Sequence, residues 1–150
     1  MLGTAEWVQG LGLVQALRVS SYAYPLVSAA HVAALGLLFG AIAVVDASVV
    51  RRGRLDLARH LGAIRTALAG FAGAATTGAV LFAVRAGEYV QNPIVGIKFA
   101  LIALAGINAS VLHRAVRRAS ARPSAYRAAA AVSLTLWMGV IVCGRLIGFY

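Results

Sequence analysis

The 150-residue sequence has few acidic residues, histidines and cysteines, and each shortage excludes a class of protein. With Cys143 as the only cysteine, the chain can form no internal disulfide bond. Four acidic residues and three histidines supply neither paired carboxylates within an apolar segment nor a clustered metal-ligand spacing. A serine-nucleophile motif and a glycine-rich phosphate loop are also absent from the sequence. We therefore find no catalytic motif and do not expect the chain to act as an enzyme on its own.

The sequence is rich in apolar residues, and its positive charge is unevenly placed. It is 61% hydrophobic and 12% charged, more apolar surface than a soluble domain of this size can bury. The net charge is +10, and nine of the 14 basic residues fall within 51–59 and 114–127. Because excess Lys and Arg stay in the cytoplasm during insertion, we expect both basic connections there. No basic patch interleaved with aromatic residues suggests nucleic-acid binding.

Apolar segments at about 22–50, 61–84, 94–112 and 128–150 predict four membrane spans, since each can cross about 30 Å of hydrocarbon. Residues 6–19, with Trp7, predict a short amphipathic helix lying in the outer interface. Small residues recur every four positions in the second span (Gly70, Ala74 and Gly78), which favours close helix packing. The predicted fold is an all-α integral membrane protein. It would be a single transmembrane domain, an antiparallel up-down four-helix bundle with both termini outside.

Polar residues near the cytoplasmic ends of the spans predict a structural polar cluster. Asp46 and Arg65 fall at similar depth on consecutive spans, so we expect a charge-assisted pair, with Asn108 nearby on the third. Proton or ion conduction is the alternative for this cluster. His60 and His113 are expected to be solvated at the membrane surface.

Polar residues nearer the outer ends predict a binding site made of one imidazole among cations and aromatic rings. Its residues would be His31, Arg85, Lys98, Trp137, Arg145 and Tyr24. His31 could ligate haem b or a transition metal, with Cys143 as a weaker metal ligand. The cations could instead hold a quinone carbonyl, a lipid phosphate or an anionic substrate. The alternative is that His31 only hydrogen-bonds a serine or tyrosine in the bundle core.

Three stretches resemble a family of small uncharacterised bacterial inner-membrane proteins with four helices. They are Tyr24–Gly40, Thr76–Ala109 and Ser133–Tyr150. In size and helix number that family is loosely like membrane b-type cytochromes and copper-resistance membrane proteins. The resemblance implies a multi-pass protein of the bacterial cytoplasmic membrane with periplasmic termini. It identifies no reaction.

Three functional hypotheses follow from these residues. The first is a binding or electron-transfer module with a periplasmic-side site for haem b, a metal or a quinone. The second is a non-catalytic subunit or scaffold of a larger membrane complex, and the third is a small transporter. The expected partners are the lipid bilayer, a quinone or a membrane redox partner, and further copies of this or another chain.

Overall fold

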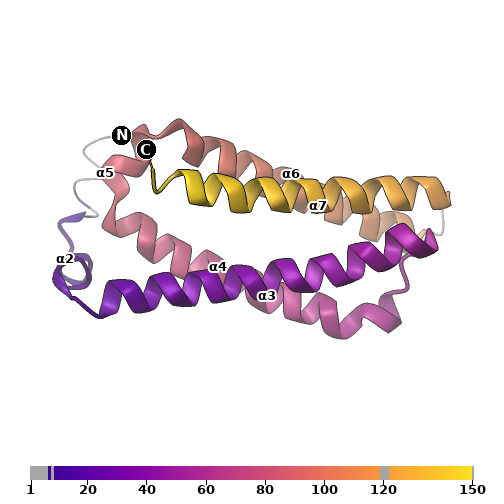
Figure 1. Ribbon diagram of the computed structural model, residues 1–150, viewed down its shortest axis with the longest axis horizontal. Helices are drawn as coiled ribbons and strands as arrows, with labels where there is room; N and C mark the ends of the chain where they lie inside the picture. Colours follow the sequence, from indigo (N-terminus) through magenta and orange to yellow (C-terminus); the bar gives the residue numbers. More distant parts are fainter. Residues whose placement is uncertain (1–6, 8, 119–121, 150) are drawn as a thin grey trace.

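The computed structural model describes residue 7 and the ranges 9–118 and 122–149, so residues 6 and 150 of the expected segments lie outside the described residues. Within these ranges the regular elements are helices, with no strand. The elements are α2 (Gly12–Val19), α3 (Ala23–Arg52), α4 (Leu57–Val84), α5 (Ala86–Gln91), α6 (Pro93–Arg117) and α7 (Pro123–Leu146) (Figure 1). The helices α3, α4, α6 and α7 are long and apolar enough to cross a membrane. The prediction of an all-helical, multi-pass membrane protein is thereby confirmed.

The long helices extend further into the basic segments than the sequence predicts. α3 continues through Arg52 and ends at Gly53, whose φ of 67° is in the left-handed region that favours glycine. α4 begins at Leu57 because the Asp56 carboxylate caps it, accepting a hydrogen bond from the Arg59 amide at 3.1 Å. These ends leave the connection 53–56 between α3 and α4, too short to hold another element.

The connection between α4 and α6 contains a short helix, α5, which the sequence reading treats only as a loop. Asn92 ends α5 and caps α6, where its side chain accepts a hydrogen bond from the Ile94 amide at 2.9 Å. Pro93 then occupies the first position of α6, where the missing amide hydrogen costs little. α5 thus turns the chain sharply from α4 into α6.

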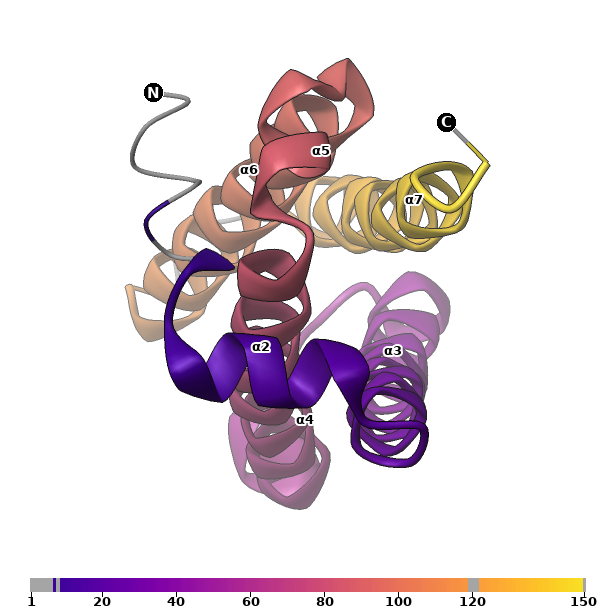
Figure 2. The same ribbon diagram turned by 90° about the vertical axis from the view of Figure 1, so that its left-hand side faces the viewer.

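Two helix pairs form the body of the molecule. α3 packs on α4, α6 packs on α7, and contacts between α3 and α7 join the pairs (Figures 1 and 2). Among the described residues, α4 and α6 make no close backbone contact, so this side of the bundle is open. α2 lies across the ends of α3 and α4 (Figure 2). We call the end near α2 and α5 the α5 end and the opposite end the basic end.

The α3–α4 seam depends on glycine. A Cβ atom at Gly70 would lie 2.6 Å from the backbone nitrogen of Leu38 and 3.0 Å from the carbonyl oxygen of Ala34. Only a residue without a side chain permits the two backbones to approach so closely. The small-residue repeat of the second span therefore serves helix packing.

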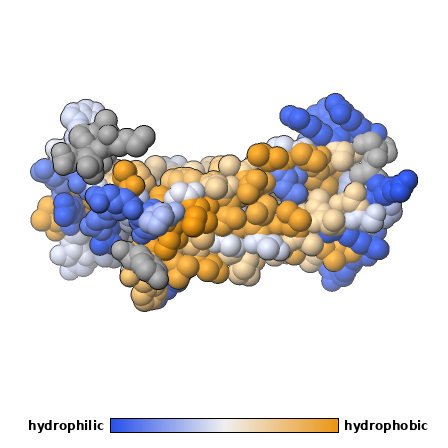
Figure 3. Space-filling model, turned by 90° about the horizontal axis from the view of Figure 1, so that it is seen from above, coloured by the Kyte–Doolittle hydropathy of each residue, from blue (hydrophilic) through white to orange (hydrophobic). Residues whose placement is uncertain are grey.

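Side chains are buried mainly at the basic end, whereas the helix flanks expose apolar residues. Val49, Leu112, Tyr126 and Ala130 form a buried cluster that joins α3, α6 and α7. Around the middle of the molecule, large apolar side chains form a broad band between two hydrophilic ends (Figure 3). Val44, Leu68, Phe99 and Ile107 are each more than half exposed there. This distribution suits a protein whose flanks contact lipid rather than water.

Candidate functional site

His31 lies between α3 and α4, where its ring contacts the second span. Its Nδ1 atom is 2.9 Å from Oγ1 of Thr77, and a Cβ atom at Gly78 would lie 3.0 Å from Cε1 of the ring. Glycine at 78 therefore makes room for the imidazole. Counted along the helices, His31 is about 12 Å from the start of α3 and Thr77 about 10 Å from the end of α4. The pair is within the membrane-spanning part of both helices.

The Thr77 hydroxyl fixes the roles of the two ring nitrogens. Its proton points to the Gly73 carbonyl oxygen, 2.6 Å from Oγ1, so the same oxygen accepts a hydrogen bond from Nδ1 of His31. In the neutral ring, Nδ1 then carries the hydrogen and Nε2 carries the lone pair. Among the described side chains Thr77 is the hydrogen-bond partner of the ring, and the Ala74 carbonyl oxygen is a further acceptor beside it. The imidazole is therefore held from one side and can accept a hydrogen bond on the other.

Lys98 brings a positive charge to the same level of the bundle from α6. Its Nζ atom would be 3.5 Å from a Cβ atom at Gly144, and Cys143 of α7 is its electrostatic neighbour. Lys98 is also close enough to His31 for its charge to act on the ring. No ion pair to this ammonium group occurs among the described side chains. Residues from all four long helices thus meet near one level.

The two predicted arginines are at the rim rather than beside His31. Nε of Arg85 is 3.0 Å from Oε2 of Glu88, and both side chains are well exposed. Arg145 places its guanidinium carbon 4.9 Å from the centre of the Phe149 ring. Each arginine therefore has a partner near its own helix end. Of the three expected cations, Lys98 is the one that accompanies His31.

The predicted aromatic residues occupy two other places. Trp137 contacts Phe71 edge-on, with ring centres 6.5 Å apart, and so links α7 to α4. Tyr24 lines a shallow hollow on α3 with Ser28 and is a neighbour of Tyr89 in α5. Burial is the main cause that raises the pKa of Tyr89 above its ordinary value of 10.0. Trp137 is near the middle of the bundle and Tyr24 near the α5 end, and neither contacts His31 in any interaction identified among the described residues.

The residues expected to cluster at the basic end separate into individual environments. Asp46 is 5% exposed, whereas Arg65 is exposed to the surroundings, and the structure does not bring them together as an ion pair. Asn108 donates a hydrogen bond from Nδ2 to the Ala129 carbonyl oxygen at 3.0 Å, joining α6 to α7. His60 differs from the solvated histidine that we expected. It is 7% exposed, and its Nδ1 is 2.8 Å from the Asp56 carbonyl oxygen.

The donor set around His31 does not fit haem or a transition metal. No group of three His, Cys, Asp or Glu side chains gathers in the described ranges, and His31 with Cys143 would supply at most two ligands. The second imidazole that a bis-histidine haem requires is not at this level, because His60 is bound near the basic end. The expectation of a metal or haem centre is therefore not supported.

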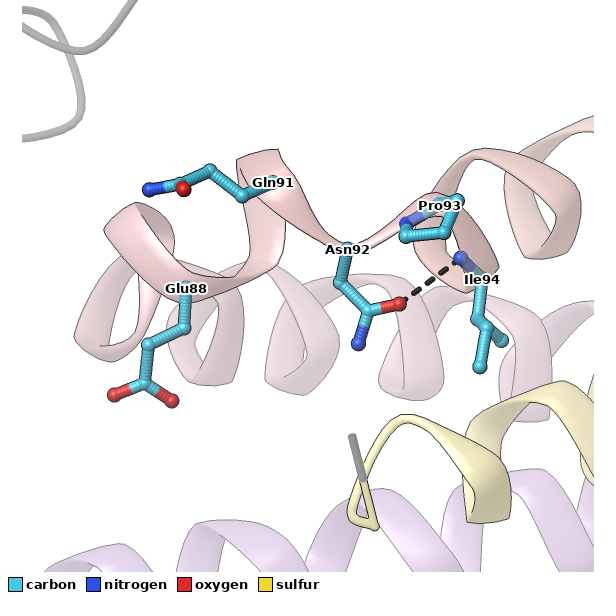
Figure 4. A pocket seen from close by; sticks show the side chains of 5 residues that line it. All are labelled: Glu88, Gln91, Asn92, Pro93 and Ile94. Atoms are coloured by element: carbon cyan, nitrogen blue, oxygen red, sulfur yellow. Dashed lines mark hydrogen bonds between the residues drawn. The ribbon is translucent and has the colours of Figure 1, made fainter.

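A separate hollow is at the junction of α5 and α6, lined by Glu88, Gln91, Asn92, Pro93 and Ile94 (Figure 4). The Asn92 side chain turns back to the Ile94 amide, whereas Glu88 and Gln91 point away from it. The polar groups of this hollow do not converge on one point. It carries no candidate site.

Thr77 and Phe82 matter to this region, and the sequence reading did not select them. In the sequence, Thr77 could be noticed only as a hydroxyl residue next to a glycine, at the depth expected for His31. Phe82 contacts Phe99 with ring centres 6.4 Å apart and Tyr89 at 5.8 Å, so it bridges the open side between α4 and α6. Its role depends on how far apart those helices are, which no sequence pattern reveals.

The fold and the His31 region define a class: a multi-pass helical membrane protein with a histidine and a lysine near one level of its bundle. Comparison with known proteins adds no narrower identity, because no family model, curated protein or solved structure matches the chain.

Proposed function

We propose that the protein is a bacterial cytoplasmic-membrane protein that binds a lipid-soluble quinone or its quinol between His31 and Lys98. The observation that carries the proposal is the pairing of two complementary groups below the membrane surface. Nε2 of His31 offers a lone pair, and the Lys98 ammonium group offers hydrogens without an ion-pair partner among the described side chains. A quinol hydroxyl can donate to the first group, and a quinone carbonyl can accept from the second.

Depth and hydrogen-bond polarity favour a quinone over a lipid phosphate. His31 is about 12 Å along α3 from its outer end, below the level where phosphate headgroups gather. A phosphate diester has only acceptor oxygens, which would face the lone pair of Nε2 unfavourably. A quinone head is apolar around its oxygens and enters the hydrocarbon region readily. Between α4 and α6, which make no close backbone contact, the Phe82 and Phe99 rings would have to separate to admit the quinone from the lipid.

The proposal includes the orientation of an antiparallel up-down bundle. We place the basic end in the cytoplasm, because Arg and Lys next to spans are retained there. The α5 end, with α2 in the interface and both termini nearby, then faces the periplasm. His31 and Lys98 are accordingly assigned to the periplasmic half of the membrane, where a membrane redox partner would exchange quinol with the site.

Quinone binding can be measured by quenching of Trp137 fluorescence. The reporter is purified full-length protein with Trp7→Phe, titrated with a short-chain ubiquinone or menaquinone analogue. We expect Lys98→Met to weaken binding at least tenfold, which is about 1.4 kcal/mol, because the variant keeps the apolar stem and removes the charge. Thr77→Val should weaken binding less, by freeing the ring of His31 to rotate. Arg85→Gln is the matched control at the rim and should leave the affinity unchanged.

Other outcomes distinguish the alternatives. Equal affinities for the parent protein and the Lys98→Met and His31→Gln variants would refute the site. Competition by a lysophospholipid, with no effect of the quinone analogue, would replace the quinone with an anionic headgroup. Absence of binding to either, with lower stability in His31→Gln, would leave the scaffold hypothesis in its place.

Orientation needs a separate test, because a quinone site could be on either side of a membrane. In a Cys143→Ser background, single cysteines at Ser21 and Ser124 mark the two ends of the bundle. A membrane-impermeant maleimide added to intact spheroplasts should label Ser21→Cys and spare Ser124→Cys. The reverse pattern would invert the proposed topology.

A further inference from the structure

A buried carboxyl group is present in α3 near the basic end, apart from the quinone site. Asp46 is 5% exposed, and its buried Oδ2 atom has no hydrogen-bond partner among the residues that the structure describes. The residue is one turn before Val49, a member of the buried apolar cluster, and about 9 Å along α3 from Arg52. A polar atom left unpaired at such a place requires an explanation.

Among the described residues, no basic side chain of a neighbouring helix forms an ion pair with Asp46. On α4, Arg65 is exposed and His60 is bound to the Asp56 carbonyl oxygen. On α7, the polar side chains nearby are Ser133, which faces the carboxyl group, and Tyr126 of the apolar cluster. Within the described part of the chain the only ion pair is Arg85–Glu88, at the other end of the bundle.

The energetics then decide between an ionised and a neutral side chain. A buried carboxylate without a cation or a full set of hydrogen bonds is strongly unfavourable, whereas a neutral carboxylic acid avoids most of that desolvation cost. The Ser133 hydroxyl can donate to the carboxylate or accept from the acid O–H, so one neutral hydroxyl does not compensate a buried charge as a cation would. We propose that Asp46 is a proton-binding site in the cytoplasmic half of the bundle and takes up a proton under mildly acidic conditions, in which an exposed carboxyl group stays ionised.

This site is independent of the proposed quinone site, since Asp46 is near the basic end and His31 near the α5 end. Its occupant is a proton rather than a metal ion, because one carboxyl group and one hydroxyl are too few ligands for a bare cation. A group of this kind inside a membrane span can accept a proton from one region and release it to another. That capacity is absent from a carboxylate fixed in an ion pair.

Reaction with dicyclohexylcarbodiimide tests the proposal on the intact protein. This apolar reagent enters micelles and attacks protonated carboxylic acids, and the chain has only four acidic residues with which it could react. We expect one adduct on the peptide that contains Asp46 at mildly acidic pH, with a yield that falls as the pH is raised through neutrality. The exposed Asp56 side chain should not react under the same conditions. Asp46→Asn, which keeps the shape of the side chain, should abolish the adduct.

Arg65→Ala supplies the matched control against a hidden ion pair. If Asp46 holds a proton, this variant is labelled as the parent protein is. An unlabelled parent that becomes labelled in Arg65→Ala would overturn the proposal, because Arg65 would then be neutralising the carboxylate. Protection by sodium or potassium ions at constant pH would also overturn it, by identifying an alkali cation as the occupant. Absence of the Asp46 adduct at every pH tested would exclude a protonated acid.

Discussion

The two sides of helix α4 are built in opposite ways. Toward α3 the helix presents Gly70, whose Cα faces the Leu38 backbone so closely that no side chain fits. Toward α6 it presents Phe82, which reaches Phe99 across a gap with ring centres 6.4 Å apart. Among the described residues, the first side is a backbone seam and the second has no close backbone contact. The seam holds His31 against the α4 backbone, whereas the aromatic side is joined by side chains alone.

Gly70→Ala should produce the largest effect, because the added Cβ meets backbone atoms that cannot move aside. We expect a loss of about 3 kcal/mol in the free energy of unfolding. Denaturation by sodium dodecyl sulfate, followed by circular dichroism, measures it. Gly62→Ala is the control on the same helix, since nothing lies within 4 Å of its added Cβ. Alanine there should be neutral or stabilising by up to about 1 kcal/mol. Equal destabilisation by both variants would contradict the backbone seam.

Phe82→Ala should have a moderate effect. Lipid can replace the lost ring surface, so the expected cost is the aromatic contact itself, about 1 kcal/mol. A double-mutant cycle with Phe99→Ala, measured by the same unfolding titration, isolates that contact. Leu104→Ala changes a half-exposed residue of α6 and should alter stability little. A Phe82→Ala cost as large as that of Gly70→Ala would mean that the two sides of α4 are packed alike.

Alkaline titration should give the smallest effect, confined to α5. Because burial raises the pKa of Tyr89 above 10.0, the folded protein favours the neutral phenol. The stabilisation from this phenol is fully present below pH 10.0 and is lost as the pH rises through the higher folded value. Ultraviolet absorbance should show a late-ionising tyrosine that Tyr89→Phe removes. An unchanged titration in Tyr89→Phe would show that this phenol is not the late-ionising one.

Periodicity and charge located the helices but not their ends. The apolar spans were found because lipid requires long apolar helices whatever their partners. Helix ends depend on local capping residues. Gly53 caps the end of α3 and Asp56 caps the start of α4, so both helices extend beyond their expected bounds. The helix α5 is a short helix between two long ones. Its six residues carry too little periodicity to be distinguished from a loop.

The residues of the candidate site were likewise predictable from the sequence only in part. His31 and Lys98 could be selected from the sequence, because ionisable groups are rare inside spans. Thr77 could not, because a threonine is common in such helices and its bond to His31 depends on the rotation of α4 about its axis. The expected pair of Asp46 and Arg65 rested on equal depth alone. Depth says nothing about which way each side chain faces, and Arg65 faces outward.

The sequence alone determined that this protein is helical, multi-pass and charged mainly at one end. These properties follow from the solvent, since a long apolar helix satisfies its own backbone hydrogen bonds in a bilayer and basic connections are retained on one side during insertion. Tertiary structure decided which polar residues meet. Thr77 is the partner of His31, Lys98 forms no ion pair with any described side chain, and Asp46 is buried without an ion pair to Arg65. Those outcomes depend on the rotation and spacing of packed helices, which glycine contacts such as that of Gly70 set to within an ångström.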